Sequence, residues 1–460
     1  MPSVGPQQLR DSIVKARVHN ERDKFIATIR EEQVCALASS YHRGDNCRYF
    51  AKPVRGSYNI CFFVTFDDGD KWVVRIPLAP CLAFEARSKL ESEVATMLVI
   101  SERTDIPIPK VVAYDLGESS GPLTSFLILE YVEGEKLSFS QLGSLSDTQR
   151  EHLYHSLAEI YTQLRRLEFS FIGCLRRLGQ GGTEVSKMTT SIDINMQELE
   201  GLNPSRIQAS YYKNGSLTSA NAYTSMLLDI ADNAFAQSRS SVIEDEDEVD
   251  YRFDQGPFVL VHGDLEPFNL IVNDEMDIVC VLDWEWSRIV PCQFFKPPLW
   301  FANPDPTVLA YDFMYQRYIE QFDQFLAAVR TLERKRYGNE LLSNEWAAAK
   351  KDSGFLVANA LENWTDIDWF AFRYINKKCY QGEDLEERVK AFMDEVPARK
   401  LFVKRKLREG ITYTAEVKAL GDKMHNEADA APSGEEQPGS HLVQDRCASI
   451  SCQGVPPSAA

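Results

Sequence analysis

The fold of this chain is decided by residues 258–272, which read Phe258-Val259-Leu260-Val261-His262-Gly263-Asp264-Leu265-Glu266-Pro267-Phe268-Asn269-Leu270-Ile271-Val272. An apolar run leads into a short polar loop, and a second apolar run carries the chain away from it. The polar turn at 273–277 and the apolar run at 278–282 predict that this second run is one strand of an antiparallel hairpin. The hairpin then ends on Asp283-Trp284-Glu285.

Three polar side chains fall at the open end of this predicted hairpin. Asn269 directly precedes its first strand, Asp283 directly follows its second strand, and Asp264 stands on the loop that leads in. Phosphoryl transfer needs a carboxylate that orients and deprotonates the acceptor hydroxyl, together with oxygen ligands that hold magnesium. We therefore predict Asp264 as the base, and Asn269 and Asp283 as magnesium ligands. His262 is expected to brace the loop by hydrogen bonding, without exchanging the proton itself.

The order and spacing of these residues resemble the aminoglycoside phosphotransferase and choline-kinase-like family. The usual pattern of that family is His-Gly-Asp-Leu-His-Pro-x-Asn-Ile, followed by Ile-Asp-Trp-Glu, and Glu266 replaces its second His here. The resemblance extends from about Gly56 into the 370s and is closest to a divergent branch found in filamentous fungi. It implies an α/β (α+β), protein-kinase-like fold with two lobes, a mixed β small lobe and a mainly helical large lobe.

The resemblance also implies an activity. It predicts a small-molecule kinase that transfers the γ-phosphate of ATP to a hydroxyl of a metabolite, with Mg²⁺ as cofactor. The alternative is a catalytically silent kinase-like binding or scaffold protein, because the nucleotide loop has one glycine and Arg75 replaces a lysine. Phosphorylation of protein substrates is disfavoured, because no segment after Asp283 resembles the activation segment of a protein kinase.

The small lobe of the family contributes a loop over the phosphates and a cation on the next strand. By this resemblance, Gly56, Ser57 and Asn59 belong to the phosphate loop, and Arg75 stands where the family has lysine. Guanidinium pairs with phosphate and carboxylate, but it is larger than ammonium and does not simply replace it.

A helix glutamate and a hinge complete the nucleotide site that the resemblance implies. Glu93 is the expected partner of the strand cation, because Val94 and Met97 then face the core, and Glu91 is the alternative. Backbone groups of Glu130 and Val132 are expected to bind the adenine edge.

Acceptor specificity is expected to come from the helical region after the catalytic hairpin. Tryptophan and carboxylate side chains in that region are candidates for the pocket wall, although helix tryptophans also serve as core residues. These candidates are Trp300, Trp364, Asp366, Asp368 and Trp369.

Apolar periodicity and composition divide the chain into four segments. We expect a helical N-terminal extension (1–45), a small nucleotide-binding lobe (46–133), a large catalytic and acceptor-binding lobe (134–424) and a disordered tail (425–460). The expected elements are a hairpin at 60–66 and 71–76, a helix at 84–102, strands at 111–114 and 126–131, and helices at 147–167, 307–335 and 344–375.

Charge and cysteine content limit the partners and the compartment. The formal net charge is −18, which repels nucleic acid and anionic membranes, so neither is an expected partner. The ten cysteines show no zinc spacing, and no signal peptide or apolar run of about 18 residues occurs. We expect a cytoplasmic protein that binds a nucleotide and a small hydroxyl-bearing metabolite, while its oligomeric state stays open.

Overall fold

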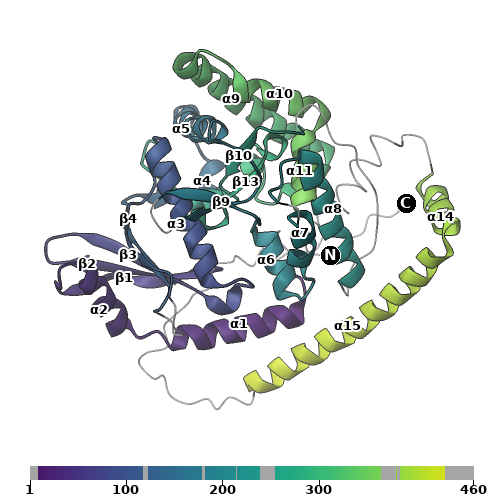
Figure 1. The fold of residues 1–460 in the computed structure, drawn as a ribbon, viewed down its shortest axis with the longest axis horizontal. Helices are drawn as coiled ribbons and strands as arrows, with labels where there is room; N and C mark the ends of the chain where they lie inside the picture. The colour runs from purple at the N-terminus through teal and green to yellow at the C-terminus, as the bar shows by residue number, and fades with distance from the viewer. Residues whose placement is uncertain are drawn as a thin grey trace.

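In the computed structural model, the described residues are 9–117, 123–178, 182–213, 215–238, 254–363, 380 and 384–429. A five-stranded antiparallel sheet comes first and a mainly helical part follows, which confirms the predicted two-part kinase-like fold (Figure 1). The sheet order is β1-β2-β3-β5-β4. Its strands are β1 (Cys47–Arg55), β2 (Asn59–Phe66), β3 (Lys71–Pro77), β4 (Val111–Asp115) and β5 (Phe126–Glu130).

The predicted hairpin in this sheet is confirmed as β2 and β3. The two strands pair from Asn59 with Pro77 to Thr65 with Lys71, and their connecting turn holds Gly69 at φ +97°. Their alternate apolar side chains form a core with β5 and with two preceding helices, α1 (Ser12–Ala27) and α2 (Glu31–Tyr41). The expected helical N-terminal segment is therefore packed on the sheet.

Helix α3 (Ala86–Arg103) links the sheet to the helical part. Leu90, Val94 and Met97 are buried in the core that also contains the helices of the large part. Glu93 faces the same interior and is 3% exposed. The helix ends before Pro107, close to its predicted boundary.

The helical part forms the other half of the molecule, with α9 and α10 at the end far from β1–β3 in Figure 1. Its predicted helices are confirmed at α5 (Asp147–Arg165) and α9 (Asp312–Tyr337). Of the predicted helical stretch 344–375, the part up to 363 is described as two helices, α10 (Leu341–Asp352) and α11 (Gly354–Glu362), which meet at Ser353 with φ +63°. Residues 364–375 lie outside the described residues. The remaining helices of the described residues are α4 (Phe139–Leu142), α6 (Ile192–Leu199), α7 (Pro204–Tyr211), α8 (Ala220–Gln237), α14 (Leu385–Glu395) and α15 (Pro397–Asp429).

Short strands within the helical part position the catalytic segment. Strand β10 (Phe258–Val261) pairs with β13 (Arg288–Pro291) and β7 (Glu168–Phe169). The predicted catalytic hairpin is confirmed, because β11 (Leu270–Val272) pairs with β12 (Ile278–Val281) and also with β6 (Glu135–Lys136). Strands β8 (Cys174–Arg177) and β9 (Thr183–Ser186) form a separate pair.

Single helical turns connect these elements. They are the 3₁₀ segments η1 (Ala79–Cys81), η3 (Pro267–Asn269), η4 (Trp284–Trp286), η5 (Cys292–Phe294), η6 (Leu299–Phe301) and η7 (Pro306–Ala310). Among the described residues, no helix is both long enough and apolar enough to cross a bilayer. Of the predicted tail, 425–429 continue α15, while 430–460 lie outside the described residues.

Candidate active site

The catalytic loop leaves β10 through a close backbone contact at Gly263. Its φ of +85° is a conformation that side chains disfavour, and a Cβ atom there would lie 2.1 Å from the carbonyl oxygen of Trp286. Ser287 Oγ donates to the His262 carbonyl at 3.2 Å. The two chain segments that carry His262 and Trp286 are therefore held against each other, and only glycine fits between them.

His262 braces this loop, as its position in the sequence predicts. Its Nε2 lies 2.8 Å from the carbonyl oxygen of Leu282, and the amide N–H of Asp264 donates to Nδ1 at 3.3 Å. A single tautomer, with the proton on Nε2, satisfies both contacts. Burial lowers the pKa of His262 to about 4, although the Leu282 contact favours the charged form. The ring is therefore neutral and ties the catalytic loop to the end of β12.

Asp264 and Asn269 are joined directly. The Nδ2 of Asn269 donates to the Asp264 carbonyl oxygen at 2.8 Å and to its carboxylate Oδ2 at 3.1 Å. The amide N–H of Leu282 donates to the Asn269 carbonyl at 2.8 Å, which places Asn269 beside the segment that carries Asp283. Asp283 itself has φ +69°, a left-handed turn that ends the strand. The structure thus brings together the three residues predicted as base and metal ligands.

Arg75 extends from β3 into a buried cluster of carboxylates. Its Nη2 lies 2.5 Å from Asp283 Oδ1 and 2.7 Å from Glu285 Oε2, and its Nη1 donates to Glu93. Burial opposes the charge, yet the three carboxylates raise the pKa of Arg75 well above its ordinary value. The expected pairing of the strand cation with Glu93 is present in the structure, and Glu91 is absent from these contacts among the described residues.

A second cation, Lys89, enters the cluster from the first turn of α3. Its ammonium donates to Glu285, and it lies 4.7 Å from the ring centroid of Trp286 and 5.3 Å from that of Tyr58. Three carboxylates thus face two cations. Burial is the main cause that raises the pKa of Glu93 to about 7; Arg75 opposes this shift, while Glu285 and Asp283 add to it.

The predicted phosphate loop rests on the same cluster. Gly56 N–H donates to the Asn59 carbonyl at 2.8 Å, so the loop forms a tight turn between β1 and β2. Asn59 Nδ2 donates to Glu285 Oε2 at 2.7 Å, and Tyr58 packs edge-on against Trp286 with ring centroids 4.9 Å apart. Ser57, at the tip of the turn, is exposed.

The predicted hinge includes the end of β5 and the residues just after it. The amide N–H of Glu130 donates to the Lys110 carbonyl at 2.9 Å, so this N–H is already used within the sheet. Val132 is partly exposed just beyond the strand. Adenine contacts at the two residues remain a prediction.

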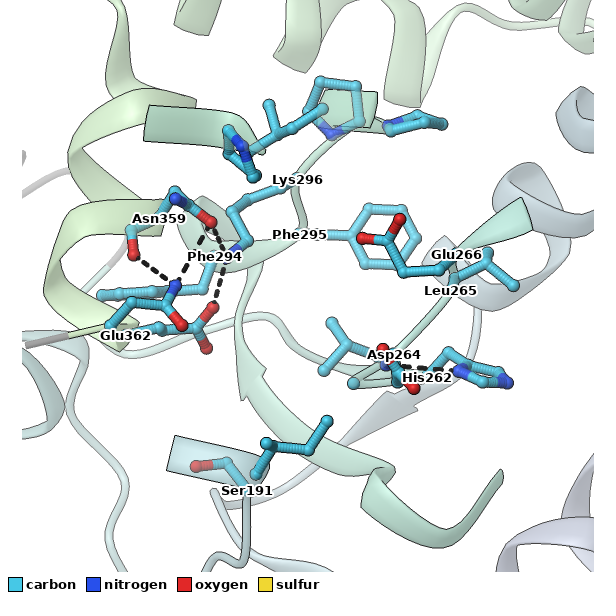
Figure 2. Close-up of a pocket in the computed structure, with 18 of the residues that line it drawn as sticks. Ser191, His262, Asp264, Leu265, Glu266, Phe294, Phe295, Lys296, Asn359 and Glu362 are labelled. Atoms are coloured by element: carbon cyan, nitrogen blue, oxygen red, sulfur yellow. Dashed lines mark hydrogen bonds and ion pairs between the residues drawn. The ribbon is translucent and has the colours of Figure 1, made fainter. Parts of the chain in front are cut away.

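A cavity of about 180 Å³ opens on the other side of Asp264. Figure 2 shows Asp264 and Glu266 on one wall and the Lys296, Asn359 and Glu362 group on the facing wall. Lys296 Nζ donates to Glu362 at 2.7 Å and to Asn359 at 3.1 Å. Burial and the neighbouring Asp264 raise the pKa of Glu266 well above its ordinary value. The apolar part of the wall includes Leu265, Phe294, Phe295, Leu299 and Trp300.

Trp300 is the one acceptor-wall candidate that falls in the described residues. It lines the cavity, and its indole N–H donates to the Leu265 carbonyl at 2.8 Å, so it also fixes the catalytic loop. The other candidates, Trp364, Asp366, Asp368 and Trp369, lie outside the described residues.

Several side chains of the candidate site were not predicted from the sequence. Lys89 lies four residues before Glu93, and this spacing places both side chains on the same face of a helix. The spacing is the sequence feature that could have indicated Lys89. Glu362 sits on α11, where it accepts from Lys296 and also from Arg288 at 2.6 Å. Although burial favours its neutral form, these two cations hold the pKa of Glu362 below its ordinary value. No local pattern marks such a long-range group.

Comparison with known protein sequences gives one family match and several partial relatives. A model of the phosphotransferase enzyme family matches residues 52–291, more than half of the chain. A subtelomeric hrmA-associated cluster protein of Aspergillus fumigatus is 30% identical over 131 residues, covering 28% of this chain and 25% of that protein. Altered inheritance of mitochondria protein 9, a mitochondrial protein of Zygosaccharomyces rouxii, is 22% identical over 396 residues, covering 69% and 63%. The chain covers less than two thirds of either relative.

Solved structures give matches of low identity. Aminoglycoside phosphotransferase APH(2'')-Ib bound to ADP is 13% identical, with a TM-score of 0.33 and coverage of 84% of this chain and 99% of that one. The streptomycin–ATP–APH(2'')-IIa ternary complex is 14% identical, with a TM-score of 0.34 and coverage of 67% and 87%. A macrolide 2'-phosphotransferase of Brachybacterium faecium is 16% identical, with a TM-score of 0.30 and coverage of 71% and 98%.

Proposed function

The chain belongs to the phosphotransferase enzyme family, and from this premise we propose that it transfers the γ-phosphate of ATP to a hydroxyl of a small molecule. The observation that carries the proposal is the meeting of Asp264, Asn269 and Asp283 at one end of the catalytic hairpin, beside a cavity. The unpaired cysteines of the described residues support a cytoplasmic setting.

Asp264 is the proposed base. Its carboxylate borders the cavity, where an acceptor hydroxyl has access to it, and Asn269 fixes one of its oxygens. His262 holds the backbone of the same residue, so the carboxylate needs little reorganisation before it accepts the proton. The attacking hydroxyl then loses its proton to Asp264 as its oxygen bonds to the γ-phosphorus, while the bond from that phosphorus to the bridging oxygen breaks and ADP leaves.

Asn269 and Asp283, on the nucleotide side of Asp264, are suited to hold a magnesium ion bound with the nucleotide. Asn269 uses its amide nitrogen for Asp264, which leaves its amide oxygen available, and Asp283 adds a carboxylate nearby. Oxygen ligands with one or two carboxylates are what magnesium prefers in proteins. When bound, the ion would neutralise charge on the nucleotide phosphates.

The buried cluster supports the nucleotide side of the site. Arg75 contacts Glu93, Asp283 and Glu285, so it braces the sheet, α3 and the catalytic hairpin. The ammonium of Lys89 lies 5.3 Å from the ring centroid of Tyr58 in the phosphate loop. Its long aliphatic side chain is flexible. We assign Lys89 the phosphate contact that the family's strand lysine makes, because its ammonium has three donors and, within the described residues, pairs with one carboxylate, whereas Arg75 pairs with three.

The test is nucleotide turnover by wild type and by Asp264→Asn, first with water as the acceptor and then with a panel of hydroxyl metabolites. We expect the variant to bind ATP as tightly as wild type and to turn it over roughly a hundredfold more slowly, the scale expected for loss of a general base. Equal turnover would exclude Asp264 as the base. Failure of wild type to bind ATP would favour the silent binding protein.

A further inference from the structure

Among the described residues, the contacts that attach helix α15 to the rest of the molecule lie along one face. Phe402 stacks on Phe235 of α8 with ring centroids 5.3 Å apart, and the ammonium of Lys406 donates to the Ser238 carbonyl at the end of that helix. Near the middle of α15, the Tyr413 hydroxyl accepts from the Ser12 N–H at 2.8 Å. In Figure 1 the helix runs along the edge of the molecule.

The opposite face of α15 exposes large aliphatic side chains. Leu401 is 67% exposed, Leu407 59% and Ile411 72%. At 100° per residue these three side chains point away from Phe402 and Tyr413, so one helix has an attached face and an outward apolar face. Scattered apolar residues need no explanation on a surface, but three within eleven residues on one side of a helix form a patch.

Cations alternate with this apolar patch. Residues 397–411 contain six Lys or Arg and one Glu, in a chain whose total charge is −18. Arg399 and Lys400 pair with Glu395 and Asp394 of α14, and Arg405 and Lys406 lie within ion-pair distance of Glu409. Lys404 and Arg408 are exposed between the aliphatic side chains, and neither makes an ion pair within the described part of the chain. The outward face of α15, defined as Leu401, Lys404, Leu407, Arg408 and Ile411, is thus both basic and apolar.

We propose that the outward face of α15 binds an anionic lipid surface, so that the protein attaches peripherally to a membrane. Anionic headgroups complement Lys404 and Arg408, and the three aliphatic side chains reach the boundary of the acyl region. Long basic side chains extend past apolar neighbours to keep their charges at the headgroups. This inference is independent of the proposed catalytic function.

The negative total charge does not prevent this contact. Charges further than a Debye length, about 8–10 Å at physiological ionic strength, are largely screened, so a bilayer in contact with α15 experiences mainly the local charge of this helix. The chain's total charge therefore overstates the repulsion at this one edge.

A membrane fits this face better than a groove in an acidic protein. Helix-in-groove recognition relies on large anchor side chains at i, i+3, i+4 and i+7, and aromatic residues dominate such contacts. The aromatic side chains Phe402 and Tyr413 of α15 are turned inward, onto α8 and α1. What faces outward is aliphatic and basic, as in interfacial helices.

The test is sedimentation of the full chain with vesicles of phosphatidylserine and phosphatidylcholine, and with vesicles of phosphatidylcholine alone. We expect binding to the anionic vesicles only, weakening as salt rises. Lys404→Glu/Arg408→Glu should reduce that binding about tenfold or more, as expected for the loss of two cations at the surface. Leu407→Ser/Ile411→Ser should also reduce it.

The matched control is Lys335→Glu/Lys351→Glu, which makes the same charge change at exposed positions on α9 and α10. We expect this control to bind anionic vesicles nearly as tightly as wild type. Equal losses in both double variants would mean a non-specific charge effect and would overturn the proposal. Absence of vesicle binding by wild type would also overturn the proposal. If, in addition, Lys404→Glu/Arg408→Glu turned a dimer into a monomer, the face would be an interface between two copies of the chain.

Discussion

Arg75 Nη2 lies 2.5 Å from Asp283 Oδ1, so the cation of the small sheet directly holds the carboxylate proposed to bind magnesium. The same guanidinium reaches Glu93 on α3 and Glu285 just beyond the catalytic hairpin. Three elements distant in sequence are therefore fixed by one side chain. Because Arg75 is so fully engaged, a metal ion at Asp283 would share this carboxylate with it, and Asp283 becomes the most informative position for testing the metal assignment.

We predict that Asp283→Ala abolishes magnesium-dependent binding of ATP while the fold persists. Glu93 and Glu285 still neutralise Arg75 in the variant, and the excess negative charge of the cluster disappears. The measurement is thermal stability with ATP, with and without magnesium, where saturating ligand stabilises wild type by about 3 kcal/mol at a hundred times Kd. Asp274→Ala, on the exposed turn of the same hairpin, is the control. Full magnesium-dependent stabilisation of Asp283→Ala would refute the metal assignment.

We predict that Lys89→Met weakens ATP binding about tenfold or more and leaves adenosine binding unchanged. Methionine keeps the contacts of the stem with Tyr58 and Trp286 but removes the charge, whose pairing with a phosphate is worth roughly 1.5–3 kcal/mol. Lys71→Met makes the same change on β3, where Lys71 pairs with Glu133, and should affect neither ligand. If affinity for adenosine falls as much as affinity for ATP, Lys89 has only a structural role.

The sequence predicted the parts of the site that are local. The spacing of Asp264, Asn269 and Asp283 follows from one loop and one hairpin, and alternation of apolar residues is enough to place them together. Strand β1 was not predicted, because Pro53 and charged residues interrupt its pattern. Such a pattern is tolerated in β1 because it lies at the edge of the sheet.

The contacts that define the cluster and the cavity could not be read from local patterns. Lys89 and Glu285 are 196 positions apart, and Arg288 and Glu362 are 74 apart. Each is an ordinary charged residue in its own segment, where a solvent-exposed position is the usual outcome. Only the packing of α3 and α11 against the catalytic segment buries them, and that packing depends on the whole core.

We predict that Gly263→Ala destabilises the protein by about 2–4 kcal/mol or prevents folding, measured by urea denaturation. The new methyl group would meet the Trp286 carbonyl oxygen at 2.1 Å, and φ +85° is strained for alanine. Gly69→Ala separates the two effects, because Gly69 has φ +97° with nothing within 4 Å of an added Cβ. We expect that variant to lose only about 1 kcal/mol. Equal losses at both glycines would show that the close approach at Gly263 is unimportant.

We predict that His262 makes the stability of the protein fall more steeply in mild acid than the stability of a variant without it. The pKa of buried His262 is lowered to about 4, whereas an unfolded histidine titrates near about 6.5. Above the unfolded value neither state binds the proton. As the pH falls from about 6.5 to about 4, His262 becomes protonated in the unfolded chain but stays neutral in the folded protein. The free energy of unfolding therefore decreases across this window.

The measurement compares urea denaturation of wild type and His262→Gln at several pH values between about 7 and about 4. Glutamine is uncharged at every pH and can still donate to the Leu282 carbonyl, the contact that His262 makes at 2.8 Å. Its own packing defect shifts the stability by a constant amount, so only the pH dependence is diagnostic. Wild type should lose on the order of 3 kcal/mol more than the variant across the window, since each unit of pKa shift is worth about 1.4 kcal/mol. Parallel pH profiles for the two proteins would show that His262 is not held neutral, and its role as a brace would then have to be abandoned.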